Sequence, residues 1–213
     1  MHMKLYRVRL VLLALAAMAA IAASAFAAAQ QPRTLLVLGD SISAAYGLAP
    51  GSGWVDLLAK RIAVEHLNYR VVNASISGDT TAGGRARLPT LLKQHKPSVV
   101  VVELGGNDGL RGGDLKATRA NLDAIVTAAK SADAKVLIAA MRMPPNYGSA
   151  YVREFDTLFT SVARERNAAL VPFLFEGFGE KAELFQSDRI HPTATAQQAI
   201  LDNVWPHLAP MLK

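Results

Sequence analysis

The sequence contains no cysteine, and this absence removes several kinds of chemistry at once. A disulfide framework, a thiolate nucleophile, a metal held by cysteine and a lipid-modified N-terminal cysteine are all excluded. The 213 residues, 51% of them hydrophobic, are sufficient to build one domain around a single core. Any covalent catalysis by a side chain would therefore use an oxygen nucleophile.

The chain also lacks a strong charge of one sign. It has 23 basic and 17 acidic residues, and three of the basic ones, Lys4, Arg7 and Arg9, precede residue 30. Because no acidic residue lies in that segment, the rest of the chain has 20 basic against 17 acidic residues, a net charge of +3. There is no basic stripe interleaved with aromatic residues, so we predict no nucleic-acid partner.

Residues 1–29 have the layout of a secretory signal peptide. A basic start precedes an apolar run at Leu10–Ala23, and small residues then allow cleavage after Ala27 or Ala29. The alternative is an uncleaved anchor helix, since the apolar run nearly reaches the length needed to span a bilayer. We predict a single domain over residues 30–213, periplasmic or secreted, with no membrane span after cleavage.

Short apolar runs alternate with longer amphipathic segments after residue 30. Strands are expected at 34–38, 70–73, 98–104, 135–140 and 169–173, and helices at 53–66, 81–94, 115–131, 150–167 and 195–207. The second helix is the weakest, because Gly83 and Gly84 lie near its start and Pro89 lies inside it. Asp114 is expected to cap the third helix, and Gln198 to complete a capping box in the last.

The expected strands are apolar on both faces, which is typical of a parallel sheet covered by helices on both sides. We therefore predict a three-layer α/β/α, flavodoxin-like fold with a five-stranded parallel sheet. In such sheets the ligand site lies beyond the carboxyl ends of the strands. Small and polar residues do follow these ends, in four clusters at 39–43, 73–79, 105–108 and 188–192.

Ser41 follows the first strand and is the candidate nucleophile. A serine hydroxyl needs a base, and His191 is the candidate because Pro192 biases it away from helical geometry. Asp188 lies one turn of chain earlier and can orient the imidazole. Each residue also has a purely structural interpretation. A serine at this position is a common helix N-cap, and Asp-x-x-His is a common turn before a helix. Asp40 is interpreted only as a turn or cap residue. The other histidines after residue 30 are expected at the surface: His66, His95 and His207.

An oxyanion hole needs donors that converge on the reacting carbonyl oxygen. The backbone N–H of Ser41 can serve, Gly78 can offer its own N–H without a side chain in the way, and Asn107 can offer its side-chain amide. A turn glycine and a turn asparagine are the plainer interpretations of Gly78 and Asn107 taken singly. The coincidence of all four clusters at strand ends favours a site.

These residues resemble the sequence blocks of the GDSL, or SGNH, hydrolases, especially the bacterial thioesterase I, protease I and lysophospholipase type and its arylesterase relatives. The resemblance covers nearly all of the chain after the signal segment. It rests on Gly39-Asp40-Ser41-Ile42, Gly78, Gly105-Gly106-Asn107-Asp108, Asp188-x-x-His191, and the strings at 71–80, 87–97 and 102–112.

The resemblance implies hydrolysis of small acyl esters, thioesters or lysophospholipids through an acyl-serine, with no cofactor and no metal. It implies a triad of Ser41, Asp188 and His191 and an oxyanion hole of Ser41, Gly78 and Asn107. It also implies a mobile loop at 109–114 and an acyl groove. The candidate groove residues are Leu110, Met143, Asn146 and Tyr147.

The sequence departs from the family pattern at three positions. Ile42 replaces the usual leucine, Met143 stands where relatives carry leucine, and Pro145 stands where alanine is common. Two rival functions remain open. One is a non-enzymatic flavodoxin-like module that binds a phosphate or nucleotide, although no Walker or G-x-G-x-x-G motif is present. The other is an esterase acting on acetylated sugars.

Overall fold

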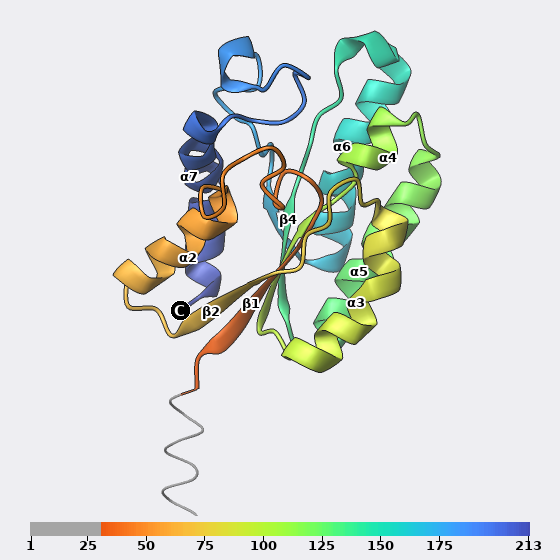
Figure 1. The fold of residues 1–213 in the computed structure, drawn as a ribbon. Helices are drawn as coiled ribbons and strands as arrows, with labels where there is room; N and C mark the ends of the chain where they lie inside the picture. The colour runs from red at the N-terminus through yellow and green to blue at the C-terminus, as the bar shows by residue number, and fades with distance from the viewer. Residues whose placement is uncertain (1–30) are drawn as a thin grey trace, which may run out of the picture. The chain divides into compact units, whose positions relative to one another are not determined.

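A five-stranded sheet forms the centre of the computed structural model, which describes residues 31–213 (Figure 1). The strand order is β2-β1-β3-β4-β5, and every neighbouring pair is parallel. The strands are β1 (Arg33–Gly39), β2 (Tyr69–Asn73), β3 (Val99–Glu103), β4 (Lys135–Ala139) and β5 (Ala169–Val171). All five lie where the apolar runs predict them, and the predicted sheet is confirmed.

Helices cover both faces of the sheet, as Figure 1 shows. On one face lie α2 (Trp54–Val64) and α7 (Gln197–Leu208). On the other lie α3 (Thr81–His95), α5 (Leu115–Ser131) and α6 (Ser149–Arg166). Strand β1 shows why this requires apolar residues throughout: Leu35 and Val37 pack in the core under the first pair, and Leu36 and Leu38 in the core under the other three. The predicted three-layer architecture is therefore confirmed.

Helix α3 forms over its whole predicted length and one residue further, despite its glycines and Pro89. Gly84 is needed because α3 packs closely on the sheet. A Cβ atom added to Gly84 would lie 2.2 Å from Cδ1 of Leu104, which is fully buried. The Thr80 hydroxyl caps the helix by accepting a hydrogen bond from the Gly83 N–H. Close packing and a good cap thus offset the weak helix propensity.

Two predictions about helices are wrong or incomplete. The capping box at Gln198 does not form, because the N-cap of α7 is Ala196, which has no side-chain oxygen, and the Gln198 amide donates to Asp202. Gln197 takes the structural role, accepting a hydrogen bond from the Trp54 N–H at 3.0 Å. The short helix α4 (Gly106–Leu110) was not predicted. Asp114 does cap α5, accepting from the Lys116 N–H at 2.9 Å.

The predicted signal peptide, residues 1–29, lies outside the described residues. Within residues 31–213, no helix has the length and apolar character needed to cross a membrane. The start of β1 lies beside the last residues of the chain, since Arg33 Nη2 donates a hydrogen bond to the Leu212 carbonyl at 3.1 Å. Both belong to the amino edge of the sheet, the edge opposite the predicted ligand site.

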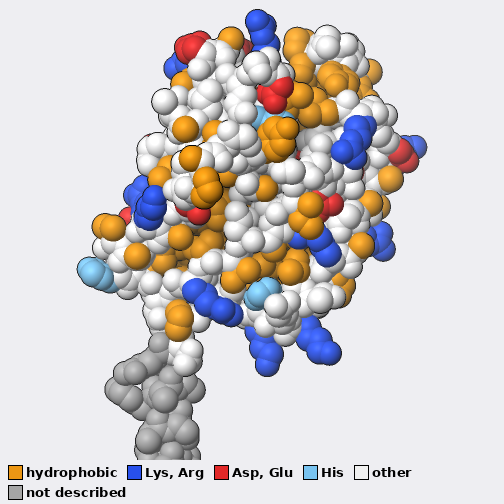
Figure 2. All heavy atoms as spheres, viewed as in Figure 1, with side chains coloured by type: hydrophobic (Ala, Val, Ile, Leu, Met, Phe, Trp, Pro, Cys, Tyr) orange, Lys and Arg blue, Asp and Glu red, His pale blue; other side chains and the backbone are white. Residues whose placement is uncertain are grey.

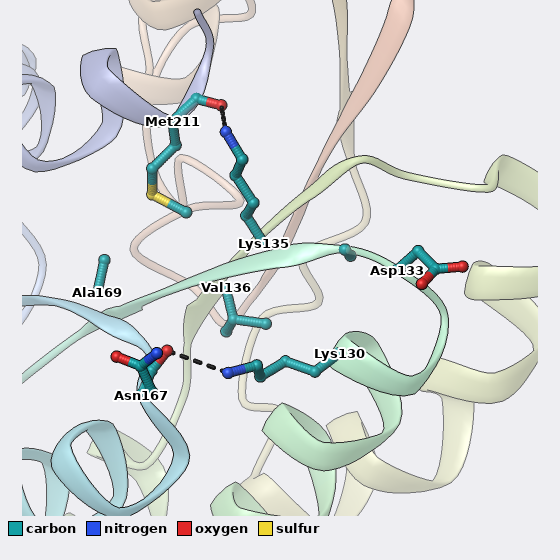
Figure 3. A pocket seen from close by; sticks show the side chains of 8 residues that line it. Lys130, Asp133, Lys135, Val136, Asn167, Ala169 and Met211 are labelled. Carbon is teal, nitrogen blue, oxygen red and sulfur yellow. Dashed lines mark hydrogen bonds between the residues drawn. The ribbon is translucent and has the colours of Figure 1, made fainter.

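A cavity of about 380 Å³ also lies at this amino edge, between the starts of β4 and β5 and the ends of α5 and α6 (Figure 3). Its two lysines already bind backbone carbonyls. Lys130 Nζ donates to the carbonyl of Asn167 at 3.1 Å, and Lys135 Nζ donates to that of Met211 at 3.1 Å. None of the predicted site residues lines this cavity. We therefore look for the active site at the opposite edge of the sheet, at the carboxyl ends of the strands.

Candidate active site

Ser41 begins a tight turn at the carboxyl end of β1 and is 8% exposed. The turn closes because the Asp40 carboxylate accepts the Ile42 N–H at 3.0 Å and the Asp40 carbonyl accepts the Ala44 N–H at 2.9 Å. This bears out the interpretation of Asp40 as a turn residue. Gly39 is required here because an added Cβ would lie 2.7 Å from the Ser43 side chain. The serine is thus held rigidly at the sheet edge.

His191 lies against Ser41 although 150 residues separate them. Its Nε2 is 2.9 Å from Ser41 Oγ, and its Nδ1 is 2.6 Å from Asp188 Oδ2. The other Asp188 oxygen accepts the backbone N–H groups of Ile190, at 2.9 Å, and His191, at 3.0 Å. The structure therefore joins the three predicted triad residues in one hydrogen-bonded chain.

The charge of Asp188 is stabilised by these same contacts. Its partial burial raises the pKa of the carboxyl group, but the hydrogen bonds from the His191 ring and from two backbone N–H groups outweigh that effect. The net result lowers the pKa of Asp188 to about 2. The carboxylate is therefore ionised at neutral pH, which is the state that stabilises an imidazolium.

The loop that carries His191 is attached to the loop that carries Ser41. Gln186 donates its side-chain amide to the Tyr46 carbonyl at 2.8 Å, and its backbone N–H donates to the His191 carbonyl at 2.8 Å. The Tyr46 and His191 rings lie 4.6 Å apart between centroids. These contacts hold the loop that carries His191 next to the turn that carries Ser41.

Gly78 and Asn107, the predicted oxyanion donors, are both tied to the same region. Asn107 lies in α4, and its Nδ2 donates to Asp40 Oδ2 at 3.0 Å. Gly78 has a φ of +78°, which favours glycine, and its carbonyl accepts a hydrogen bond from Arg111 at 3.0 Å. Among the described residues, the N–H groups of Ser41 and Gly78 donate to no other protein group. Both remain available to a ligand.

Glu103 was not predicted as part of the site, and it lies completely buried beneath these loops at the end of β3. Its Oε2 accepts the Ser43 hydroxyl at 2.7 Å and the Asp40 N–H at 3.3 Å. A signal was present, because an acidic residue directly after four valines is unusual in a buried strand. Burial also raises the pKa of Asp40, to about 6, against the opposing hydrogen bonds of Ile42 and Asn107.

The predicted groove residues are only partly brought together. The Tyr147 hydroxyl donates to the Leu110 carbonyl at 2.9 Å, and Met143 is buried against Gly109, where an added Cβ would lie 2.6 Å from the sulfur. Asn146 is exposed and forms no hydrogen bond with the other described residues. Figure 2 shows hydrophobic side chains gathered at this end of the molecule, next to the segment that joins β4 to α6.

Two tyrosine hydroxyls hold the loop that the resemblance predicts to be mobile. In addition to the bond from Tyr147, the Tyr151 hydroxyl lies 3.3 Å from the Gly109 carbonyl and 3.1 Å from the Gly113 carbonyl. The mobility of this loop stays a prediction. The structure identifies the contacts that would have to break for it to move.

Exposed hydrophobic side chains border the Ser41–His191 pair. Tyr46 is 52% exposed and Ile190 43% exposed, on the two loops that meet there. Ile76 is 52% exposed, and its N–H donates to the Gly39 carbonyl, two residues before Ser41. The approach to the hydrogen-bonded chain is therefore flanked by apolar surface that an apolar ligand can cover.

A serine, a histidine and an aspartate joined in this order at the carboxyl edge of a parallel sheet define the class of the protein, the serine hydrolases. Comparison with known proteins gives the family. Residues 37–199 match the model of the GDSL-like lipase/acylhydrolase family, and the chain belongs to that family.

Relatives agree over nearly the whole domain. The esterase TesA of Pseudomonas aeruginosa is 54% identical over 186 residues, which cover 87% of this chain and 91% of that protein. Thioesterase 1/protease 1/lysophospholipase L1 of Escherichia coli is 44% identical over 179 residues, covering 84% and 85%. The crystal structure of the psychrotrophic esterase EstA from Pseudoalteromonas sp., inhibited by monoethylphosphonate, matches with a TM-score of 0.80 at 40% identity, covering 84% and 98%. The chain is therefore an enzyme, and the rival of a non-enzymatic binding module is wrong.

Proposed function

We propose that this protein hydrolyses carboxylic esters and thioesters with Ser41 as the nucleophile, His191 as its base and Asp188 as the orienting carboxylate. The observation that carries the proposal is the continuous chain from Ser41 Oγ to His191 Nε2, at 2.9 Å, and from His191 Nδ1 to Asp188, at 2.6 Å. Both distances lie within the range required for proton transfer in the ground state.

The reaction follows from this geometry. His191 Nε2 takes the Ser41 proton as Oγ bonds to the acyl carbon, and the same proton then passes to the departing oxygen or sulfur. A water molecule, deprotonated by His191, next attacks the acyl-serine. The carbon–Oγ bond breaks, the proton returns to Ser41, and the carboxylic acid leaves.

We propose that the negative charge of each tetrahedral intermediate is held by the N–H groups of Ser41 and Gly78 and by the Asn107 amide. Three features support this role. The two backbone groups have no protein acceptor among the described residues. Asn107 uses one amide hydrogen toward Asp40, and the second has no acceptor among residues 31–213. Hydrogen bonds tie the segments of Gly78 and Asn107 to the end of β1, where Ser41 lies, since the Ile76 N–H donates to the Gly39 carbonyl and the Asn107 amide donates to Asp40.

The substrate class is an apolar acyl group on a small leaving group, which includes aryl esters, acyl thioesters and lysophospholipids. The names of the relatives, an esterase and a thioesterase with lysophospholipase activity, support this range. The exposed side chains of Tyr46, Ile76 and Ile190 around Ser41 support an apolar substrate. We propose that Leu110, Met143, Asn146 and Tyr147 line the acyl side.

The decisive experiment measures hydrolysis of p-nitrophenyl and coenzyme A esters with acyl chains of graded length. Ser41→Ala is the control and should abolish turnover while the protein stays folded by circular dichroism. A fluorophosphonate should label the wild type and leave Ser41→Ala unlabelled, because the label bonds to Oγ. Labelling of that variant would rule out Ser41 as the nucleophile. Activity confined to acetyl esters of glycans would favour the sugar esterase instead.

We further propose that residues 1–29 are a cleaved signal peptide and that the domain over residues 30–213 acts outside the cytoplasm. The basic start, the apolar run and the small residues at positions 27 and 29 support this. N-terminal sequencing of the protein from the periplasm or medium should begin at residue 28 or 30. A start at Met1 would contradict cleavage.

A further inference from the structure

Two carboxyl groups lie directly beneath the candidate active site, and the acyl-transfer chemistry uses neither of them. Asp40 is 3% exposed and Glu103 is 0% exposed. They are linked through the backbone, because the Asp40 N–H donates to Glu103 Oε2 at 3.3 Å. The Ser43 hydroxyl donates to the same Glu103 oxygen at 2.7 Å. Glu103 thus holds the residues on both sides of the Ser41–Ile42 turn.

The network continues from Asp40 to Asn107. Asp40 Oδ1 accepts the Ile42 N–H at 3.0 Å, and Oδ2 accepts one hydrogen of the Asn107 amide at 3.0 Å. An amide nitrogen carries two hydrogens in one plane. When Asp40 fixes the direction of the first, the direction of the second is fixed as well. The orientation of Asn107 therefore depends on the placement of Asp40, which in turn depends on Glu103.

The pattern of hydrogen bonds also indicates which of the two carboxyl groups, Asp40 or Glu103, carries the negative charge. Asp40 receives a hydrogen bond on each of its oxygens, which favours its ionised form. Glu103 receives its hydrogen bonds on Oε2 alone, and its buried Oε1 has no partner among the described residues. A buried carboxylate oxygen without a donor is strongly disfavoured. The single negative charge is therefore placed on Asp40, and Glu103 is neutral.

The charged groups around this pair belong to three other segments. His191 faces Asp40 from the loop before α7. Arg87, on α3, donates to the Gly39 carbonyl at 3.2 Å and is itself neutralised by Asp79 at 2.8 Å. Asp108, beside Asn107 on α4, is turned toward Thr81, whose N–H it accepts at 2.9 Å. No described basic side chain forms a hydrogen bond or ion pair with Glu103.

We infer that Glu103 is a positioning residue, a neutral hydrogen-bond acceptor that holds Asp40 so that Asp40 directs the free amide hydrogen of Asn107 toward the oxyanion. This inference rests on the role proposed above for Asn107. It assigns to a buried strand residue a part in the rate of acyl transfer, although its side chain touches no substrate.

The first test compares two substitutions of similar volume. Glu103→Gln keeps a carbonyl acceptor for the Asp40 N–H and the Ser43 hydroxyl, and should retain kcat within about threefold. Glu103→Leu removes the acceptor and should lower kcat by about 10- to 100-fold with KM within about threefold, because it misdirects a transition-state contact. A loss of more than tenfold in Glu103→Gln, or full activity in Glu103→Leu, would overturn the inference.

The second test separates positioning from a general loss of structure. Glu103→Leu is combined with Asn107→Ala, and in that background it should lower kcat by no more than about twofold, because its effect is carried by the missing amide. Equal losses in both backgrounds would contradict the inference. If Asn107→Ala alone leaves kcat unchanged, the proposed oxyanion role fails first, so the two failures are distinguishable.

If Glu103→Leu does not fold, Ser43→Ala replaces it in the same cycle. That variant removes one donor to Glu103 and should lower kcat by about threefold in the wild-type background and not in the Asn107→Ala background. A loss that is absent, or the same in both backgrounds, would count against the inference.

Discussion

At the scale of single residues, the site depends on one side-chain amide and two buried carboxyl groups whose contacts no single sequence motif predicts. Ser41 follows the end of β1 and His191 precedes a proline in the loop before α7, and both were predicted from the sequence. The network of Asp40, Glu103 and Asn107 emerges only from contacts between segments 60 or more residues apart. The residue scale is therefore where substitutions of one functional group give the sharpest tests.

Replacing Asn107 with alanine should lower kcat by about 10²- to 10³-fold, the usual cost of removing one oxyanion donor. KM should change little, because the ground-state carbonyl needs the amide less than the intermediate does. Steady-state kinetics with a p-nitrophenyl ester gives both constants. Asn68→Ala, an exposed asparagine outside the site, is the matched control and should behave as wild type.

Replacing Asp188 with asparagine should lower kcat by between about 10² and 10⁴, because the imidazolium loses its counter-charge and the ring its orientation. The pKa of Asp188 is about 2, so in the wild type this group stays ionised down to that range and adds stability that is lost only as pH falls from 3.8 toward 2. Asp156→Asn, exposed on α6, is the control. An unchanged rate in Asp188→Asn would remove it from the triad.

At the scale of elements, the contact between α3 and the sheet is tight enough to forbid one methyl group. Gly84→Ala should lower the free energy of unfolding by about 1–2 kcal/mol, because overpacking against Leu104 outweighs the gain in helix propensity. Urea denaturation measures the change. In a Leu104→Ala background the same substitution should become neutral or stabilising, and a persistent cost would contradict the packing argument.

The loop at 109–114 offers a second test at this scale. Tyr151→Phe removes the hydroxyl that lies 3.1 Å from the Gly113 carbonyl and 3.3 Å from the Gly109 carbonyl. Hydrogen exchange of the amides in that loop should accelerate by about 3- to 10-fold, the equivalent of one lost hydrogen bond. Tyr69→Phe, whose hydroxyl has no hydrogen bond to the other described residues, should leave the exchange unchanged.

The elements also show how far sequence reasoning reaches. All five strands were predicted, because a strand that is buried on both faces has an unbroken run of apolar residues in the sequence. Helix α4 was missed because five residues with two glycines carry no helical periodicity. The cap expected at Gln198 was wrong because α7 begins at Gln197 with Ala196 as its N-cap, which has no side-chain oxygen, and the Gln198 amide donates to Asp202. The contact of Gln197 with the Trp54 N–H spans 143 residues, and no local pattern records it.

At the scale of the whole molecule, the buried carboxyl pair should make stability depend on pH. Burial, together with the negative charge of Asp40, raises the pKa of Glu103 well above its ordinary value of 4.5. Above that pH the folded chain keeps a proton that the unfolded chain releases. The free energy of unfolding must therefore fall as pH rises, by up to about 1.4 kcal/mol per pH unit for one group.

Glu103→Gln removes this titration, so its melting temperature should rise relative to wild type as pH increases from about 5 to about 8. Differential scanning calorimetry at several pH values measures the difference. Glu154→Gln, exposed on α6, should show a constant offset. A constant offset for Glu103→Gln as well would mean that the buried carboxyl group does not hold its proton.

The hydrogen bond between Arg33 and the Leu212 carbonyl brings the beginning of the first strand and the end of the polypeptide together, on the far side from Ser41. A short peptide could join these two points, and new termini could be opened in a surface turn without crossing the reaction centre. For the same reason, a tether or solid support attached after Leu212 would leave the active site around Ser41 accessible from solution.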